Sequence, residues 1–257
     1  MFLKKERLYI LKTAGMIKYL RVILSILLFF LGINTTLFGA HQKGTEIIYR
    51  CLGGNTYEVD FLFYHDCTNG LPAPSASGLA SNFSYSNNCG ATLPIESWTL
   101  VSVNEVTPTC PTALTSCDVS TGYDVEGVNL YIYRDTVTLA AGCRWDLRFS
   151  LCCRDANDNV QGSPVFFSDA QIRTNVSACN TSPILTAEPA PYICNSSPVT
   201  LSVAAIDLDG DSLTYELTEG KSAFTTNVTY TGFYTFENPI DSITPYAPNL
   251  NINPNNG

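Results

Sequence analysis

The chain has few basic residues, and this shortage limits which partners it can bind. Its 257 residues include 14 Lys and Arg against 23 Asp and Glu, and the formal net charge at pH 7 is −9. The first 40 residues hold six of the basic residues and one acidic residue, so the remainder carries 8 basic and 22 acidic residues, a formal charge of −14. Such a surface repels phosphate backbones and anionic lipids, which argues against binding to nucleic acid or to a membrane surface.

Histidine and the familiar catalytic motifs are also scarce. There are two histidines, and no Gly-x-Ser-x-Gly, His-Glu-x-x-His or phosphate-binding loop occurs. A nucleophilic triad would have to use His41, near the expected mature N-terminus, or His65, whose neighbour Cys67 is better explained as a disulfide partner. Paired carboxylates of a glycosidase can be imagined, but the sequence does not fix their separation. We therefore expect a protein that is not an enzyme.

Long apolar runs are missing after the N-terminal leader. Within Met16–Ala40, the basic residues Lys18 and Arg21 precede an apolar core, Val22–Leu31, and small residues follow. This is the layout of a secretory signal peptide cleaved near residue 40. The apolar core is short for a membrane span of ~20 residues, although an uncleaved N-terminal anchor is the alternative. We predict that residues 1–40 are removed, that no stable membrane span remains, and that the mature chain is extracellular or at the cell surface.

All ten cysteines follow the leader, and none forms a Cys-x-x-Cys pair. Because an exported chain folds in an oxidising compartment, an even number of cysteines predicts disulfides, and a zinc site is the weaker interpretation. The adjacent Cys152-Cys153 pair should take two different partners, because neighbouring strand residues point to opposite faces. Cys143 and Cys179 are within reach in sequence. Cys110 and Cys117 bracket a loop that a short disulfide could close. The connectivity stays open.

No stretch after the leader shows a sustained helical period, whereas strand patterns are frequent. In Arg144–Leu151, apolar and polar side chains alternate, as expected of a strand with one face on a core. Gly53-Gly54-Asn55 predicts a hairpin between Glu46–Leu52 and Thr56–Tyr64, with one aromatic-rich face on the second strand. The other predicted strands are Trp98–Val106, Val128–Leu139 and Val165–Arg173. We expect an all-β, antiparallel, disulfide-stabilised β-sandwich module over residues 41–179.

A second β module is predicted over residues 180–257. Its strand candidates are Val199–Ala204, Ser212–Leu217 and Thr225–Phe236. This segment has about 78 residues and about four strands, whereas a sandwich usually has ~100 residues and about seven strands. We therefore expect a truncated module whose natural sequence continues past Gly257.

The best candidate for a functional site lies in Ala205–Leu217. It holds Asp207, Asp209 and Asp211 at alternate positions, and an apolar alternation follows. Carboxylates with this spacing can direct their oxygens at one centre, as a calcium ion (Ca2+) requires. The loop is not an EF-hand, because glycine falls at position 4 rather than 6 and Thr218 at position 12 rather than Glu. The alternative is a polar β-turn without a metal, since Asp and Gly are favoured turn residues.

Four segments, in order, resemble the N-terminal region of very large surface proteins of gliding and related Bacteroidota, which the type IX secretion system exports. They are Glu46–Tyr57 (Glu-Ile-Ile-Tyr-Arg-Cys-Leu-Gly-Gly-Asn-Thr-Tyr), Tyr64-His65-Asp66-Cys67, Cys152-Cys153-Arg154, and Cys179-Asn180-Thr181-Ser182-Pro183 leading through Pro191-Tyr192-Ile193-Cys194 into the Asp-Leu-Asp-Gly-Asp stretch. The last stretch also resembles the Asp-x-Asp-Gly-Asp-x-Leu-x-Tyr signature of cadherin-like and other Ig-like modules. His65 stands where the family has Arg, and Leu208 where it has Pro; neither change affects the carboxylates.

This resemblance implies Ig-like or cadherin-like β-sandwich modules with an adhesive or structural role at the cell surface, in the context of gliding motility. The expected partner is an extracellular glycan or protein surface. A calcium ion at the three aspartates would make the loop rigid. The alternative is a stand-alone secreted module that binds carbohydrate or protein, with aromatic residues such as Trp98 or Tyr133 as a stacking platform, although a buried position is the more usual one for such residues.

Overall fold

The structure is a computed structural model that describes residues 42–68, 73–93, 98–107, 112–152, 154, 157, 159–162, 164–177, 179–187, 200–239 and 251–255. The predicted leader and three cysteines (Cys110, Cys153 and Cys194) lie outside the described residues. The chain divides into two compact units, Met1–Phe38 and Gly39–Gly257, and every described residue belongs to the second. None of the helices in the described part is both long and apolar enough to cross a membrane.

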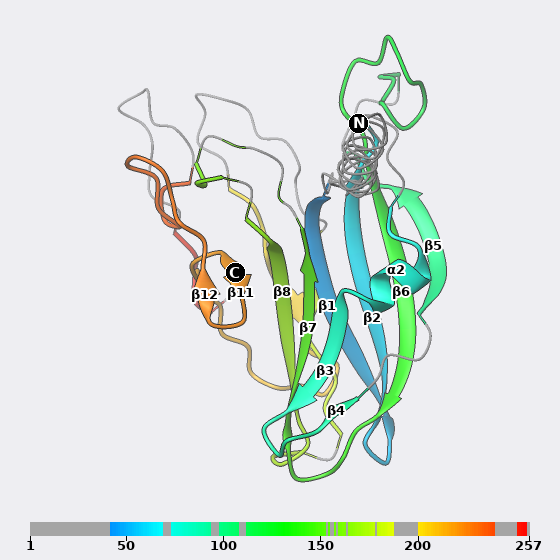
Figure 1. Ribbon diagram of the computed structural model, residues 1–257, viewed down its shortest axis with the longest axis vertical. Helices are drawn as coiled ribbons and strands as arrows, with labels where there is room; N and C mark the ends of the chain where they lie inside the picture. The colour runs from blue at the N-terminus through cyan, green and yellow to red at the C-terminus, as the bar shows by residue number, and fades with distance from the viewer. Residues whose placement is uncertain are drawn as a thin grey trace, which may run out of the picture. The chain divides into compact units, whose positions relative to one another are not determined.

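Two four-stranded antiparallel sheets make up the main body (Figure 1). The first has the order β1 (Gln42–Gly53), β2 (Thr56–Asp66), β6 (Val128–Thr138) and β5 (Thr99–Glu105). The second has the order β4 (Thr92–Leu93), β3 (Phe83–Asn87), β7 (Arg144–Leu151) and β8 (Phe166–Arg173), and the short helix α2 (Ala76–Ala80) precedes β3. Two small ribbons follow: β9 (Ile184–Leu185) with β10 (Ala205–Ile206), and β11 (Lys221–Ala223) with β12 (Thr226–Asn227).

The predicted hairpin between the first two strands is confirmed. Gly53 pairs with Thr56, so Gly54 and Asn55 form a two-residue turn with φ angles of 58° and 60°. Both central residues therefore have the left-handed conformation of a type I′ turn, whose twist matches that of the flanking strands. A register shift between Cys51 and Gly53 follows the turn, and beyond it Tyr49 lies opposite Val59.

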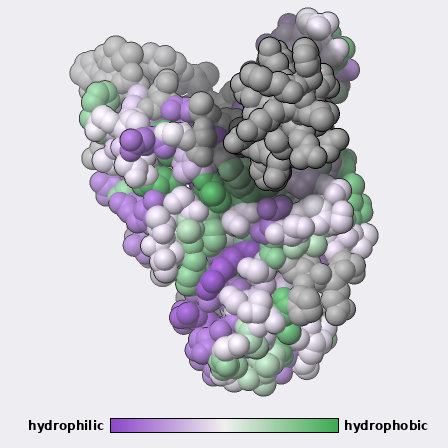
Figure 2. Space-filling view, in the orientation of Figure 1, coloured by the Kyte–Doolittle hydropathy of each residue, from purple (hydrophilic) through white to green (hydrophobic). Residues whose placement is uncertain are grey.

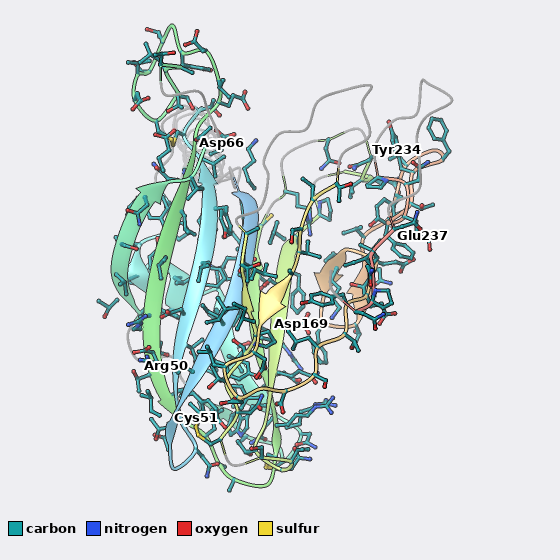
Figure 3. All side chains as sticks on the ribbon, turned by 180° about the vertical axis from the view of Figure 1, so that it is seen from behind. Arg50, Cys51, Asp66, Asp169, Tyr234 and Glu237 are labelled. Atoms are coloured by element: carbon teal, nitrogen blue, oxygen red, sulfur yellow. A yellow bond between two sulfur atoms is a disulfide. The ribbon has the colours of Figure 1, made fainter. Side chains whose placement is uncertain are left out.

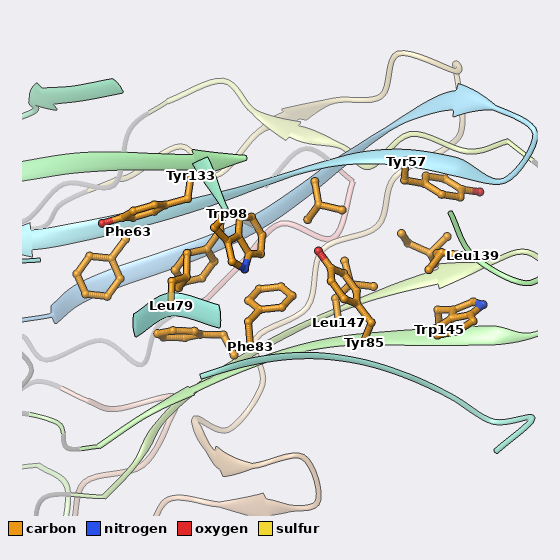
Figure 4. Close-up of a cluster of buried hydrophobic side chains, with 14 of the residues drawn as sticks. Tyr57, Phe63, Leu79, Phe83, Tyr85, Trp98, Tyr133, Leu139, Trp145 and Leu147 are labelled. Carbon is orange, nitrogen blue, oxygen red and sulfur yellow. The ribbon is translucent and has the colours of Figure 1, made fainter. Parts of the chain in front are cut away.

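Aromatic side chains from both sheets fill one core (Figure 4). Tyr57, Val59, Phe61 and Phe63, at alternate positions of β2, are at most 1% exposed. They face the apolar side of β7, and the rings of Phe61 and Phe149 lie 4.5 Å apart between centroids. Each such side chain contributes about 1.5–3 kcal/mol when it is removed from water. The alternation read from the sequence therefore identifies the face of each strand that is buried.

Three disulfides join segments that are distant in sequence: Cys51–Cys179, Cys67–Cys117 and Cys89–Cys143. The expected short Cys110–Cys117 bond is wrong, because Cys117 pairs with Cys67 at the end of β2. Cys143 and Cys179 are likewise no partners for the Cys152-Cys153 pair. The neighbouring strands β3 and β7 bring Cys89 and Cys143 together, and this proximity is set by sheet order rather than by closeness in sequence. Cys152 is also disulfide-bonded.

Beyond Cys179 the predictions agree less well with the structure. Residues 211–220 form no strand, and in place of the predicted Thr225–Phe236 strand only β12 is present. Leu213, Tyr215 and Leu217 are nevertheless half-buried while the residues between them are exposed, so the predicted alternation of burial is observed without the sheet. The proposed boundary between residues 179 and 180 stays a prediction.

Candidate functional site

The acidic loop after β10 is held by its own backbone. Oδ1 of Asp207 accepts hydrogen bonds from the backbone N–H of Asp209, at 2.9 Å, and of Asp211, at 3.2 Å. The N–H of Gly210 also reaches the Asp207 carbonyl oxygen, at 3.4 Å. These bonds are those expected of an aspartate that begins a turn. Asp207 therefore stabilises the loop itself.

Asp209 connects this loop to the rest of the protein. Its Oδ2 accepts a hydrogen bond from the backbone N–H of Thr181, at 2.5 Å. Thr181 is buried, with 7% of its surface exposed, although Asp209 itself lies at the surface. A bond from a backbone N–H to a carboxylate is stronger than one between neutral groups. The loop is thus fixed to the segment that follows the first two sheets.

That segment in turn lies along the edge of β1. The N–H of Ser182 donates to the Tyr49 carbonyl oxygen, at 2.8 Å, and the N–H of Tyr49 donates to Oγ of Ser182, at 2.9 Å. Two residues further along β1, the Cys51–Cys179 disulfide closes the same edge covalently. Cys51 and its neighbour Arg50 lie near the turn end of β1 in Figure 3. Backbone groups at a sheet edge are otherwise free to pair with another chain, and here they are covered.

Tyr49 connects β1 with β8 and with Ser182. Its hydroxyl donates to the carbonyl oxygen of Gln171 on β8, at 2.9 Å, and so ties the two sheets at their common edge. Burial raises the pKa of the Tyr49 phenol, and the negative charge of Asp207 raises it further. The phenol therefore stays neutral and able to donate this bond over the physiological pH range. We call the contacts around Tyr49, Cys51, Thr181, Ser182 and Asp209 the β1 junction.

The three predicted calcium ligands have separate contacts in this structure. Asp207 caps the turn, Asp209 binds Thr181, and the described contacts leave the Asp211 carboxylate without a partner. Across the described residues, no group of three or more His, Cys, Asp or Glu side chains is arranged to hold a metal ion. One carboxylate oxygen each of Asp207 and Asp209 and both of Asp211 remain as candidate ligands. Their donor chemistry suits calcium, which takes oxygen ligands.

The His65-Asp66-Cys67 run is occupied by structural contacts. His65 is 6% exposed, and its ring contacts those of Phe63 and Tyr131, each 5.9 Å away between centroids. Cys67 is bonded to Cys117. Asp66 forms an ion pair with Lys43, at 2.9 Å, and accepts a hydrogen bond from the backbone N–H of Thr68.

Burial acts to raise the pKa of the Asp66 carboxyl, but hydrogen bonds from Thr68 and Lys43 outweigh it and hold that pKa below its ordinary value. Asp66 is therefore a carboxylate at neutral pH, and its charge is paired with that of Lys43. Ionised and paired in this way, Asp66 stabilises the end of β2.

Trp98 and Tyr133, the two residues considered as an aromatic stacking platform, are both buried. Trp98 is 4% exposed and Tyr133 1%, and both belong to the core between the sheets (Figure 4). The hydroxyl of Tyr133 donates to the Pro74 carbonyl oxygen, at 2.6 Å. A stacking platform must present its ring faces to solvent, which these two residues do not.

Charged side chains pair on the outer faces of both sheets, next to a second apolar cluster that Tyr64, Val128 and Leu130 form on the first. On the first sheet, Arg134 donates two hydrogen bonds of 2.6 Å to Asp60. Glu58 forms ion pairs with both Arg134 and Arg50. On the second, Asp146 is buried between arginines of its own strand, and hydrophilic residues lie over β3 and β7 in Figure 2. The cross-strand ion pairs of the first sheet stabilise it by about 0.2–1 kcal/mol each.

No protein-family model, no curated protein and no solved structure matches this chain. The assignment of a function therefore depends on the residues and contacts described above. Sequence reasoning identified the acidic loop but predicted no contact for Tyr49, Thr181 or Ser182. All three belong to the segments that carry the resemblance, and Thr181 and Ser182 closely follow Cys179.

Proposed function

We propose that this chain is a non-catalytic structural and adhesive module of an exported cell-surface protein. The observation that carries the proposal is the position of the Cys51–Cys179 disulfide, with a sequence separation of 128. Strands β2 to β8 all lie between these two cysteines. Tension applied along the chain would pass from β1 through the disulfide to Cys179, so strands β2 to β8 would be shielded from it. Such an arrangement suits a protein that must stay folded under mechanical tension.

We also propose that the two sheets form an Ig-like sandwich of the kind found in adhesive surface proteins. With the eight strands named A, B, C, C′, D, E, F and G in chain order, the sheets have the orders A-B-E-D and C′-C-F-G. These are the orders of immunoglobulin-type sandwiches, in which a C′ strand is added to the second sheet. The disulfides differ from the inter-sheet bond of antibody domains, because they lie at strand ends and at an edge.

The resemblance to type IX-exported surface proteins gives this proposal its cellular context. The disulfides support export, since such bonds persist in oxidising compartments. In the proposed arrangement residues 180–257 belong to a cadherin-like module, and the β1 junction fixes it to the first. Calcium bound by Asp207, Asp209 and Asp211 would make this junction more rigid, because a bound ion offsets the repulsion among the three carboxylates.

Deletion of the gene in its native host tests the proposal. The deletion strain should lose attachment to surfaces, and a wild-type copy should restore it. The variant protein with Cys51→Ser and Cys179→Ser should still reach the cell surface. Cells that carry it should detach under flow more readily than cells that carry the wild-type protein. An antibody against the chain should label intact wild-type cells. Unchanged attachment of the deletion strain, or labelling only after lysis, would contradict the proposal.

A further inference from the structure

Basic side chains, scarce in the chain as a whole, gather at the second sheet. Residues 41–257 contain eight Lys and Arg. Five of these belong to β7 or β8 or to segments that contact these strands: Arg144, Arg148, Arg154, Arg173 and Lys221. Such a concentration of positive charge on an otherwise acidic chain indicates a place where an anion can bind.

Three of the five side chains are held by groups of the protein itself. Arg148 donates a hydrogen bond to Asp146, at 3.0 Å. Lys221 is paired with Asp169, at 2.8 Å, and Arg154 donates to the Lys221 carbonyl oxygen, at 3.3 Å. These contacts attach the β11–β12 ribbon to one end of the second sheet, and they leave the other two arginines.

Arg144 and Arg173 lie directly opposite each other in the pairing of β7 with β8. Their strand neighbours Trp145 and Ile172 are each 1% exposed and belong to the core, so both arginines project from the outer face of the sheet. Opposite residues on adjacent antiparallel strands have Cβ atoms about 4.5–5.5 Å apart, and like charges in such a pair destabilise the sheet. An anion between the two guanidinium groups would remove this repulsion.

The chain supplies little of this negative charge. Oδ1 of Asp146 lies 3.5 Å from Nε of Arg144, and neither of these two buried atoms has a hydrogen-bond partner. The same carboxylate is shared with Arg148, which it binds more closely, at 3.0 Å. Arg173 is exposed, and across the described residues its side chain forms no ion pair and no hydrogen bond. Because the Arg144 side chain is 40% exposed, both guanidinium groups can contact a ligand from solvent.

The chemistry of these side chains and the charge of the chain indicate the class of anion. A guanidinium group binds a carboxylate through two parallel hydrogen bonds. Gln171, on the same face two residues before Arg173, adds a side-chain amide without a hydrogen bond in the described part, which suits a sugar hydroxyl group. Duplex DNA carries one charge per ~1.7 Å, and the 22 acidic residues of 41–257 would repel its other phosphates. A chain of uronic acid sugars has carboxylates that are further apart and many hydroxyl groups.

We propose that Arg144, Gln171 and Arg173 form a binding site for an acidic polysaccharide that contains uronic acid. One carboxylate of the polysaccharide lies between the two guanidinium groups and accepts hydrogen bonds from both, and Gln171 binds a neighbouring hydroxyl group. The choice of a polysaccharide rests on the surface role proposed above, whereas the opposed arginines do not. Binding by the purified chain and attachment of the deletion strain are separate measurements, so either proposal can fail without the other.

The test uses the exported full chain and two fluorescent sugars, an oligomer of eight galacturonic acid units and its methyl ester, which has the same sugar backbone without the charge. Binding is measured by fluorescence anisotropy in EDTA, so that metal ions do not bridge carboxylates. The acid should bind at least ~10-fold more tightly than the ester, and its affinity should fall as salt is raised. A fluorescent oligonucleotide of eight thymidines should bind more weakly than the acid.

Matched variants separate this site from general attraction between charges. Arg173→Gln removes one exposed guanidinium group of the site and should weaken binding of the acid by at least ~10-fold. Arg50→Gln removes the same charge from the first sheet, where the side chain is 59% exposed, and should leave binding unchanged. Near-ultraviolet circular dichroism confirms that both variants fold. Equal binding of acid and ester, no binding of either, tighter binding of the oligonucleotide, equal effects of the two variants, or self-association of the chain that Arg173→Gln abolishes would overturn the proposal.

Discussion

The hydroxyl of Tyr85 on β3 donates a hydrogen bond to the carboxylate of Asp135 on β6, at 3.1 Å, and so connects the two sheets through the core. Tyr85 is fully buried, and burial, together with the charge of Asp135, raises the pKa of its phenol. The hydroxyl therefore keeps its proton and acts as a donor to an ionised acceptor. Such bonds contribute more than neutral ones.

Replacement of this phenol by a phenyl ring tests the connection. Tyr85→Phe keeps the packing of the ring but removes the donor, so we expect the free energy of unfolding to fall by about 1.5–3 kcal/mol. Tyr123→Phe is the control, because Tyr123 is at the surface, 37% exposed. Urea unfolding of the two variants measures the difference. Equal stabilities would show that the Tyr85–Asp135 bond contributes nothing.

Stability should fall at alkaline pH because of Tyr133. Burial, and to a smaller extent the neighbouring Tyr131, raises the pKa of the Tyr133 phenol to about 12 in the folded protein. In the unfolded chain a tyrosine ionises near pH 10. The unfolded state therefore loses this proton first, and stability from this group is complete below about pH 10 and is lost as the pH rises through about 12.

The Tyr133→Phe variant isolates this contribution. It should be less stable than the wild type at pH 8, because the hydrogen bond to Pro74 is gone. Between pH 10 and 12 its stability should decrease less steeply with pH than that of the wild type. Urea unfolding at several pH values gives both slopes, and parallel slopes would contradict the assignment.

Gly127 packs against Cys117 of the Cys67–Cys117 disulfide, and there is no room for a side chain at this position. A Cβ atom there would lie 2.5 Å from Sγ of Cys117 and 3.0 Å from its backbone nitrogen. Gly127→Ala should therefore destabilise the protein by about 1–3 kcal/mol or prevent the disulfide. Gly44→Ala is the matched control, since its Cβ would meet Cδ2 of Tyr64 at an ordinary 3.6 Å. Thermal unfolding and thiol titration should find free thiols or a lower Tm in the first variant alone.

Calcium binding is tested best at Asp211, because this carboxylate has no part in the loop's own hydrogen bonds. Added calcium should raise the Tm of the wild type. Asp211→Asn should remove that rise and leave the Tm in EDTA unchanged. Asp207→Ala should lower the Tm even in EDTA, because it removes the oxygen that caps the turn. A wild-type Tm that does not respond to calcium would leave the loop as a polar turn.

The sequence predicts β1, β2, β6, β7 and β8 because each has one face on a common core. β3, which also contributes to that core, was not predicted, and β5 was predicted although nearly all of it is exposed. In β2 and β7 the apolar residues recur at every second position, and this period depends only on the strand itself. The connectivity of the cysteines was not predictable in the same way. Cys89 meets Cys143 because β3 and β7 are neighbours, and that neighbourhood depends on the order of all strands in the sheet.

Part of the candidate site was predictable and part was not. Alternate aspartates with a glycine are a local pattern, so the acidic loop could be found from the sequence. Its contact with Thr181 spans 28 residues, and the contact of Ser182 with Tyr49 spans 133. Neither has a periodic or compositional signal. The strand predicted at Ser212–Leu217 shows the converse, because the pattern is present but the described residues supply no neighbouring strand.

The claim that the Cys51–Cys179 disulfide shields strands β2 to β8 from tension is tested most directly by pulling a single molecule from its two ends. The bond has a sequence separation of 128. The oxidised protein should therefore release about 430 Å less chain than the fully reduced protein, at about 3.4 Å per residue. The oxidised variant with Cys51→Ser and Cys179→Ser should give an intermediate value, because the remaining disulfides still close smaller loops. If oxidised and reduced wild-type molecules released equal lengths, the proposed path of tension would be wrong.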